Sequence, residues 1–365
     1  MTDEWDESQE VRPRSWFIRR WAAPLVLAMS VAASIGAVHL LADGAAATAP
    51  SGEQRMPRFV VAVGEIGDAA RERGPKPWFQ VRAAQAGEAR PVDSVAAPRS
   101  AGAAQSIIAG PEGTFVLSAF GEKSCTTRFY RFRLAGDGRV KELAPLVREA
   151  VPARVAGLAM SPDGARLAYA TGPCAQGAQP QSTVTVLDLG SGRRRTWSAA
   201  APSVVGEIVW ARDNRTLGYT VGEVRPEVGP GPFRERTVGN VAVLALDTGG
   251  QGADLRSGRV LFRQPDDSAA VTTAVMNPDG RAGYGVMKKA RPPSTVLFSF
   301  SAGKPMKVIQ TFETRPNVAT AFVFATDDRP RYACLGGVDS FGRVHEGRFA
   351  DTSGSGPSCS VAYAY

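Results

Sequence analysis

Histidine is scarce in this 365-residue chain, which contains only His39 and His345. His39 lies in a long apolar segment, so the rest of the chain has a single histidine, too few for a histidine-rich metal centre. The sequence has no G-x-S-x-G nucleophile elbow. Its glycine-rich stretches, such as residues 249–252, do not open a helix after a strand, as a phosphate-binding loop would. We therefore assign no catalytic residue and expect no metal and no cofactor.

Lysine is also scarce, because 36 of the 43 basic residues are arginines, and the formal net charge is +8. A basic protein attracts anionic lipid headgroups or wall polymers. No recognition helix and no aromatic–basic motif occurs, so we expect no nucleic-acid partner. The one tight basic run, Arg193–Arg195, falls in a predicted turn and is interpreted as solvated.

Two segments share a pattern of a short apolar strand, a tight turn and a second strand: Val155–Ala170 (VAGLAMSPDGARLAYA) and Val271–Val286 (VTTAVMNPDGRAGYGV). Their turns are Ser161–Gly164 (SPDG) and Asn277–Gly280 (NPDG). Proline sets φ at the first central position, aspartate bonds nearby backbone amides, and glycine tolerates the exit conformation. Each segment is therefore predicted to be a β-hairpin.

Weaker copies of the hairpin extend the series along the chain. If the fourth turn residue is the marker, the copies lie at positions 113, 164, 214, 280 and 328, with spacings of 51, 50, 66 and 48 residues. Four-stranded propeller blades repeat every 40–50 residues or so, so the spacing favours a β-propeller with one insertion. Unrelated hairpins in a β-sandwich are the alternative.

Strand-like segments fill the intervals between the markers, such as Val184–Leu189 and Asn240–Leu246. Residues near 59–95 resemble a blade without its first strand, and Cys359–Tyr365 (CSVAYAY) is a strand without a blade. We predict that this last strand completes the first blade, which closes the ring and removes exposed edges. The predicted fold is all-β, a propeller of six blades, with seven as the rival.

The SPDG-type hairpin followed by the VLDL-type strand at 184–189 resembles the TolB-type and WD-like propeller repeats of bacterial envelope proteins. The resemblance covers about residues 59–365 and is strongest at 155–197. No Trp-Asp dipeptide or Gly-His pair marks a WD repeat here. The resemblance therefore implies an architecture, and fold does not imply function.

The N-terminal region contains a candidate membrane span. Residues 21–42 form an apolar stretch without Asp, Glu, Lys or Arg, about 33 Å long as a helix against a hydrocarbon core of roughly 30 Å. Four arginines precede it, which predicts a cytoplasmic tail at 1–20 and everything after residue 42 outside the membrane. We favour an uncleaved signal anchor; cleavage near Ala45–Ala47 is the alternative. Residues 43–57 resemble a linker, and 58–365 the extracytoplasmic propeller.

Four cysteines fall in the predicted extracytoplasmic part, where disulfides persist, and sequence alone allows three connectivities. Cys125 and Cys174 occupy the same loop of adjacent repeats, 12 and 10 residues after their markers. Cys334 lies in the last hairpin and Cys359 begins the closing strand. We predict the pairs Cys125–Cys174 and Cys334–Cys359, with free buried thiols as the alternative.

The longest interval between markers contains an insertion at 221–239 (VGEVRPEVGPGPFRERTVG). Long loops on rigid scaffolds often bind partners, and an aromatic residue beside arginines suits such a surface. Phe233, Arg234 and Arg236 are therefore the candidate partner-binding residues, although a decoration without a role is equally compatible with the pattern.

Two hypotheses for the function remain. The favoured one is a membrane-anchored, extracytoplasmic propeller that is not an enzyme and binds an envelope protein or anionic envelope component. The alternative is an extracytoplasmic hydrolase or lyase that uses carboxylates in the propeller funnel.

Overall fold

The computed structural model describes residues 58–63, 78–83, 91–99, 101–174, 181–225, 238–266, 269–313, 333–335, 340–345, 348–351 and 361–364. Within these ranges the regular structure is β-strand, apart from two 3-10 turns, η2 (Pro111–Gly113) and η3 (Leu255–Ser257). The predicted all-β class is confirmed.

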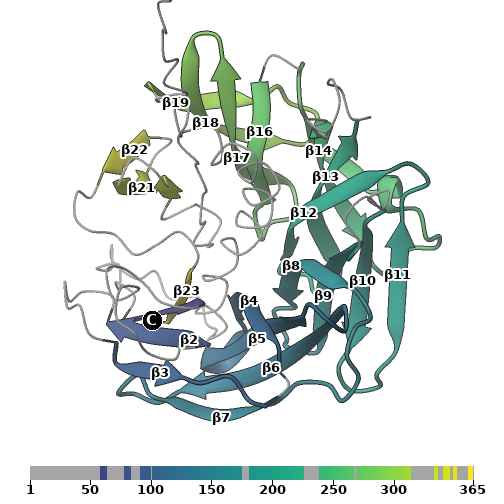
Figure 1. The fold of residues 1–365 in the computed structure, drawn as a ribbon. Helices are drawn as coiled ribbons and strands as arrows, with labels where there is room; N and C mark the ends of the chain where they lie inside the picture. Colours follow the sequence, from purple (N-terminus) through teal and green to yellow (C-terminus); the bar gives the residue numbers. More distant parts are fainter. Residues whose placement is uncertain are drawn as a thin grey trace, which may run out of the picture.

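The strands of the described chain pair into five four-stranded antiparallel sheets and one three-stranded sheet, each built from consecutive strands except the first (Figure 1). The first three sheets contain β23 (Val361–Ala364), β1 (Phe59–Val63), β2 (Phe79–Ala83) and β3 (Asp93–Val95); β4 (Ala103–Ala109), β5 (Thr114–Gly121), β6 (Thr126–Leu134) and β7 (Val140–Pro145); and β8 (Arg154–Met160), β9 (Arg166–Gly172), β10 (Thr183–Asp188) and β11 (Arg194–Ser198).

The other three sheets complete the series. They contain β12 (Ser203–Trp210), β13 (Thr216–Val224), β14 (Val238–Asp247) and β15 (Arg259–Arg263); β16 (Ala269–Met276), β17 (Ala282–Ala290), β18 (Pro293–Ser301) and β19 (Lys307–Glu313); and β20 (Ala333–Leu335), β21 (Ser340–His345) and β22 (Arg348–Asp351).

The sheets follow one another around a common centre, as in a β-propeller (Figure 1). The first strands β4, β8, β12 and β16 contact one another in turn, whereas the fourth strands β7 and β11 lie at the perimeter. The predicted propeller-like architecture is therefore seen in the order and packing of the sheets.

The last strand returns to the first sheet, as predicted. β23 pairs with β1 in antiparallel register, with Val361 opposite Ala62 and Ala364 opposite Phe59. It occupies the innermost position of this sheet, beside β1. The pairing therefore covers the strand edge that β1 would otherwise expose.

The tight turns form as their residues predict. The Ser161 hydroxyl donates to Asp163 Oδ1 at 2.5 Å, and the same oxygen accepts from the Ala165 amide at 3.0 Å. Gly164 has a φ of +69°, a conformation that L-residues avoid, and Gly280 has a φ of +71°. The turn chemistry therefore explains why these positions hold Asp followed by Gly.

The core lies between adjacent sheets, where aromatic side chains of neighbouring sheets meet. Phe79 of the first sheet stacks on Phe132 of the second at 4.7 Å between ring centroids. Trp197 and Trp210 are almost fully buried in the cluster shared by the second, third and fourth sheets. Burial of apolar and aromatic side chains between the sheets stabilises their packing.

The predicted membrane segment 21–42, its cytoplasmic tail and the linker at 43–57 lie outside the described residues. Among the residues that are described, no helix is long and apolar enough to cross a membrane.

Candidate functional site

The two ends of the strands form two different faces. The turn face carries the tight turns between first and second strands, at residues 110–113, 161–164, 211–214 and 277–280. The loop face carries the connections between second and third strands. In the described chain these are residues 122–125, 173–174 and 291–292, together with the ends of the insertion, Val224 and Val238.

Inter-sheet hydrogen bonds occupy the turn face. The Asp163 amide donates to Asn214 Oδ1 at 3.0 Å, and the Arg166 guanidinium donates to the Asn214 carbonyl. The next pair of turns is joined by the Arg212 amide, which donates to the Pro278 carbonyl at 2.9 Å. The repeated turns therefore join adjacent sheets.

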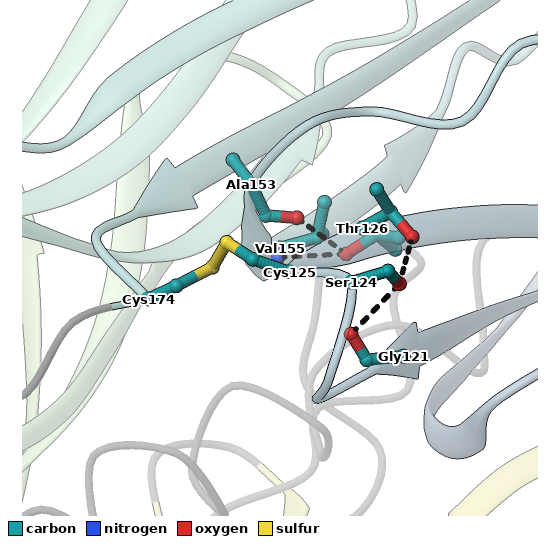
Figure 2. Close-up of a disulfide and its surroundings, with 8 residues drawn as sticks. Gly121, Ser124, Cys125, Thr126, Ala153, Val155 and Cys174 are labelled. Atoms are coloured by element: carbon teal, nitrogen blue, oxygen red, sulfur yellow. Dashed lines mark hydrogen bonds between the residues drawn. A yellow bond between two sulfur atoms is a disulfide. The ribbon is translucent and has the colours of Figure 1, made fainter.

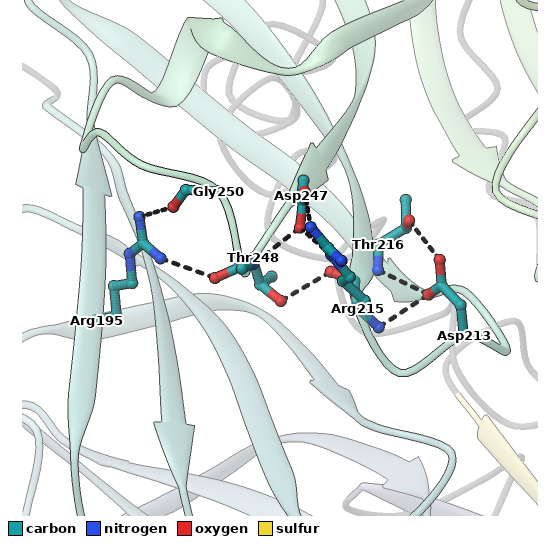
Figure 3. A network of polar contacts seen from close by, with 8 residues as sticks. Arg195, Asp213, Arg215, Thr216, Asp247, Thr248 and Gly250 are labelled. Atoms are coloured by element: carbon teal, nitrogen blue, oxygen red, sulfur yellow. Dashed lines mark hydrogen bonds and ion pairs between the residues drawn. The ribbon is translucent and has the colours of Figure 1, made fainter.

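The interpretation of the arginine run at 193–195 as a solvated turn is wrong for Arg195, which binds the neighbouring sheet, whereas Arg193 and Arg194 are exposed. Arg194 pairs with Glu149 at 3.1 Å. Arg195 donates to the carbonyls of Thr248 and Gly250, the first at 2.9 Å (Figure 3). It also donates to the Gly252 carbonyl at 2.9 Å. A guanidinium is suited to this role because it carries five donors in a planar arrangement.

Figure 3 shows that this network continues to the turn of the fourth sheet. Arg215 makes a two-point ion pair with Asp247, with both N–O distances at 2.6 Å. The hydrogen bonds from Arg215 lower the pKa of Asp247 to about 2. Asp213 accepts from the Thr216 hydroxyl at 2.6 Å. These carboxylates therefore hold turns together.

A disulfide on the loop face confirms the predicted pair Cys125–Cys174 (Figure 2). The Cα atoms are 5.9 Å apart, and the bond joins the β5–β6 connection of the second sheet to the segment after β9 in the third. The Thr127 hydroxyl donates to the Ala153 carbonyl at 2.7 Å and links the same two sheets. Cys359 and the side chain of Cys334 lie outside the described residues, so that pair stays a prediction.

The insertion leaves the loop face from a longer hairpin. β13 and β14 pair as far as Val224 and Val238, and the Val224 amide donates to the Pro202 carbonyl at 3.2 Å. Glu223 accepts from Asn240 Nδ2 at 2.6 Å and pairs with Arg256 at 3.3 Å. The candidate residues Phe233, Arg234 and Arg236 lie outside the described residues.

A basic hairpin end lies on the same face in the next sheet. Lys288, Lys289 and Arg291 follow one another at the β17–β18 connection. Burial lowers the pKa of Lys288. Lys289 and Arg291 are exposed and form no ion pair with any described residue. The loop face therefore presents positive charge that the described fold does not neutralise.

One carboxyl group lies in the interior, and the sequence interpretation missed it. Glu207, on β12, is 4% exposed, and its Oε1 accepts from Thr273 Oγ1 on β16 at 3.1 Å. Its Oε2 is buried without a hydrogen-bond partner. Burial raises the pKa of Glu207 to about 8, against the smaller opposing effect of the Thr273 hydrogen bond. Aligning the repeats by their turns would have flagged this glutamate.

In the part of the chain that the structure describes, no group of three or more His, Cys, Asp or Glu side chains is placed to hold a metal ion.

Comparison with known proteins identifies no family, because no family model matches the chain and no curated protein matches it. Solved structures of similar fold include Porphyromonas gingivalis dipeptidyl peptidase 4, with 12% identity and a TM-score of 0.42 over 81% of this chain and 47% of that one. A putative TolB from Agrobacterium tumefaciens has 11% identity and a TM-score of 0.40 over 74% and 95%.

An oligogalacturonate lyase in complex with manganese is also similar, with 12% identity and a TM-score of 0.40 over 75% of this chain and 74% of that one. The chain spans about half the length of the dipeptidyl peptidase. The activities of these proteins are not transferred to this chain, because one architecture supports many functions.

Proposed function

We propose that this protein is a membrane-anchored, extracytoplasmic β-propeller of six blades that binds an acidic partner of the cell envelope on its loop face. Segment 21–42 is the anchor, and residues 58–365 form the binding domain outside the membrane. The six sheets, the last of them three-stranded in the described residues, support the blade count.

The observation that carries the proposal is the difference between the two faces. Near the turn face, Arg166, Arg195 and Arg259 bind carbonyls of adjacent sheets, and the exposed Arg281 and Lys304 lie at the end of their sheet opposite the insertion. On the loop face, Lys289 and Arg291 are exposed, unpaired within the described chain, and share their face with the insertion. Unneutralised positive charge attracts acidic partners and accelerates their association.

Two further features support the loop face as the binding surface. The insertion starts there from a hairpin whose base is held by Glu223, and the Cys125–Cys174 bond fixes two neighbouring connections. A rigid base lowers the entropic cost of binding, because less of the surface has to become ordered.

The test is in-situ crosslinking of the full-length protein in intact cells, followed by identification of what it captures. Three forms are compared with the wild type: deletion of 226–237, the loop-face double variant Lys289→Glu/Arg291→Glu, and the turn-face control Arg281→Glu/Lys304→Glu. The control reverses two exposed charges of the same sheet at its other end.

The proposal predicts that the captured partner is lost from the loop-face variant and retained by the control, with capture that weakens as salt is raised. Equal capture by both double variants would refute the assignment of the face. Loss of the captured partner only on deletion of 226–237 would show that the partner contacts the insertion and not the basic hairpin end.

The alternative, a hydrolase or lyase, has one observation in its favour. Glu207 lies on an innermost strand and stays protonated at neutral pH, the state that a general acid requires. Hydrolysis of glycosidic bonds would need a second carboxyl group. A turnover of wall polysaccharide that falls at least a hundredfold in Glu207→Gln would support this alternative.

A further inference from the structure

Glu207 lies at the seam between the fourth and fifth sheets, which is defined here as the contact of β12 with β16. Its Oε1 accepts from Thr273 Oγ1 on β16. A second bond crosses nearby, because the Thr220 hydroxyl on β13 donates to the Ala274 carbonyl at 2.5 Å. The glutamate therefore contributes one of two hydrogen bonds that join these sheets at the same level.

The repeats show how unusual this carboxyl group is. The residue four positions before the first residue of each tight turn is Ser106, Gly157, Glu207 or Thr273. Each lies in or beside the register shift of its strand. The Ser106 and Ser118 hydroxyls form a hydrogen bond at 2.7 Å. Of the four residues, only Glu207 has an ionisable side chain.

Among the described residues, no charged group acts on Glu207: only burial and the Thr273 hydrogen bond shift its pKa. Its hydrogen-bond partner in the seam is Thr273, and on the β8 side Gly157 lies against the backbone of Gly206. Tyr219, the nearest titratable residue along β13, donates instead to the Leu255 carbonyl. Ionisation would therefore place an unpaired charge in an apolar interior, which is costly.

We propose that Glu207 is a proton-controlled latch: as a neutral acid it seals the seam between the fourth and fifth sheets, and loss of its proton favours opening of that seam. In the opened seam the carboxyl group is hydrated and ionises like an ordinary glutamate. Opening then releases one proton, so the opening equilibrium depends on pH. This inference does not depend on the identity of the partner.

The direction and range of the effect follow from the two protonation equilibria. The pKa of Glu207 is about 8 with the seam closed, against the ordinary glutamate pKa of 4.5. Between these values the opening equilibrium rises roughly tenfold per pH unit, because one proton is released on opening. Above about pH 8 the closed form is ionised as well, and the dependence levels off.

The experiment is amide hydrogen exchange of the full-length protein from pH 5.5 to 9.5, with the intrinsic exchange rates divided out. Peptides from β12 and β16 report the seam, and peptides from β5 and β6 serve as an internal control. Glu207→Gln keeps the size of the side chain and cannot ionise. Glu313→Gln makes the same change at an exposed position.

The wild type and Glu313→Gln should show the tenfold-per-unit rise in β12 and β16, and Glu207→Gln should show none. Thr273→Val removes the hydrogen bond that lowers the pKa of Glu207, so the plateau should move to higher pH. A purely structural role would change protection without moving that plateau. Exchange in β12 and β16 that is independent of pH in the wild type would overturn the proposal.

Discussion

The backbone amide of Asp163 donates to the side-chain oxygen of Asn214, 3.0 Å away, and this bond joins the turns of two adjacent sheets. Asn214 occupies the position where the SPDG and NPDG turns have glycine, and its φ is +54°. Asparagine tolerates this conformation better than other residues with a side chain. Asn214 therefore serves both its own turn and the preceding sheet.

Substitution of Asn214 should separate these two contributions. Asn214→Gly keeps the positive φ and loses the inter-turn bond, which should lower the free energy of unfolding by about 1 kcal/mol. Asn214→Ala also forces an alanine into the left-handed region, at a further cost of about 1 kcal/mol. Denaturant unfolding of the three proteins measures both steps. Equal stability of the Gly and Ala variants would contradict the conformational part.

The local part of this fold was predictable because turn chemistry acts over a few residues. The SPDG and NPDG turns predicted the β8–β9 and β16–β17 hairpins, and their common register predicted the Cys125–Cys174 bond. The closing strand followed from the strand left over at the C-terminus.

The contacts across sheets were not predictable from the repeats, because they join residues about fifty positions apart. Arg195 looked like part of a solvated turn, yet its acceptors lie 53 to 57 residues further on. Glu207 was missed because a single glutamate in a strand carries no signal of burial by itself. Only the alignment of the repeats by their turns places it at a position that serine, glycine or threonine occupies in the other hairpins.

Arg195 should be more important for stability than its neighbours in the basic run. Arg195→Ala removes the bonds to three carbonyls and the contact with Trp197, whose ring centroid lies 4.7 Å from the guanidinium carbon. We expect a loss of about 2–3 kcal/mol. Arg193→Ala is the matched control, because Arg193 is exposed, and should cost less than about 0.5 kcal/mol. Thermal unfolding of both variants measures the two losses of stability. Losses of similar size would show that Arg195 contributes no more to stability than Arg193.

Reduction of the Cys125–Cys174 bond should destabilise the protein. The two cysteines are 49 residues apart. Closing a loop of that length lowers the entropy of the unfolded chain, which raises the free energy of unfolding by up to about 4 kcal/mol. Cys125→Ser/Cys174→Ser should therefore unfold at lower denaturant concentration than the oxidised wild type. A reductant that breaks the bond in the wild type should remove most of this difference, and a difference that persists after reduction would contradict the role assigned to the bond. Peptide mapping without reductant should recover the 125–174 cross-link and, by the sequence prediction, a second one between Cys334 and Cys359.

The ion pair of Arg215 with Asp247 should affect acid titration more than neutral stability. Its side chains are 63% and 48% exposed, and solvent screening makes exposed pairs weak. Nuclear magnetic resonance should find the Asp247 pKa at about 2, and Arg215→Gln should bring it towards the ordinary aspartate pKa of 3.8. Because the pKa is lowered on folding, any stabilisation is present above pH 3.8 and is lost as the pH falls through about 2. An unchanged Asp247 pKa in Arg215→Gln would contradict the assigned cause.

The effect of Glu207 on the pH dependence of global stability should have the opposite sign to that of Asp247. Its pKa is raised from 4.5 in the unfolded chain to about 8 in the folded protein, so the folded state binds more protons between these values. As the pH rises from 4.5 to about 8, the free energy of unfolding of the wild type should therefore fall, relative to that of Glu207→Gln, by about 1.4 kcal/mol per pH unit. Below pH 4.5 and above about pH 8 the difference should be constant. Urea unfolding of the two proteins at matched pH isolates the contribution of this glutamate, because the contributions of the other titrating groups cancel in the comparison. A difference in the free energy of unfolding that does not vary with pH would show that Glu207 is ionised in the folded protein.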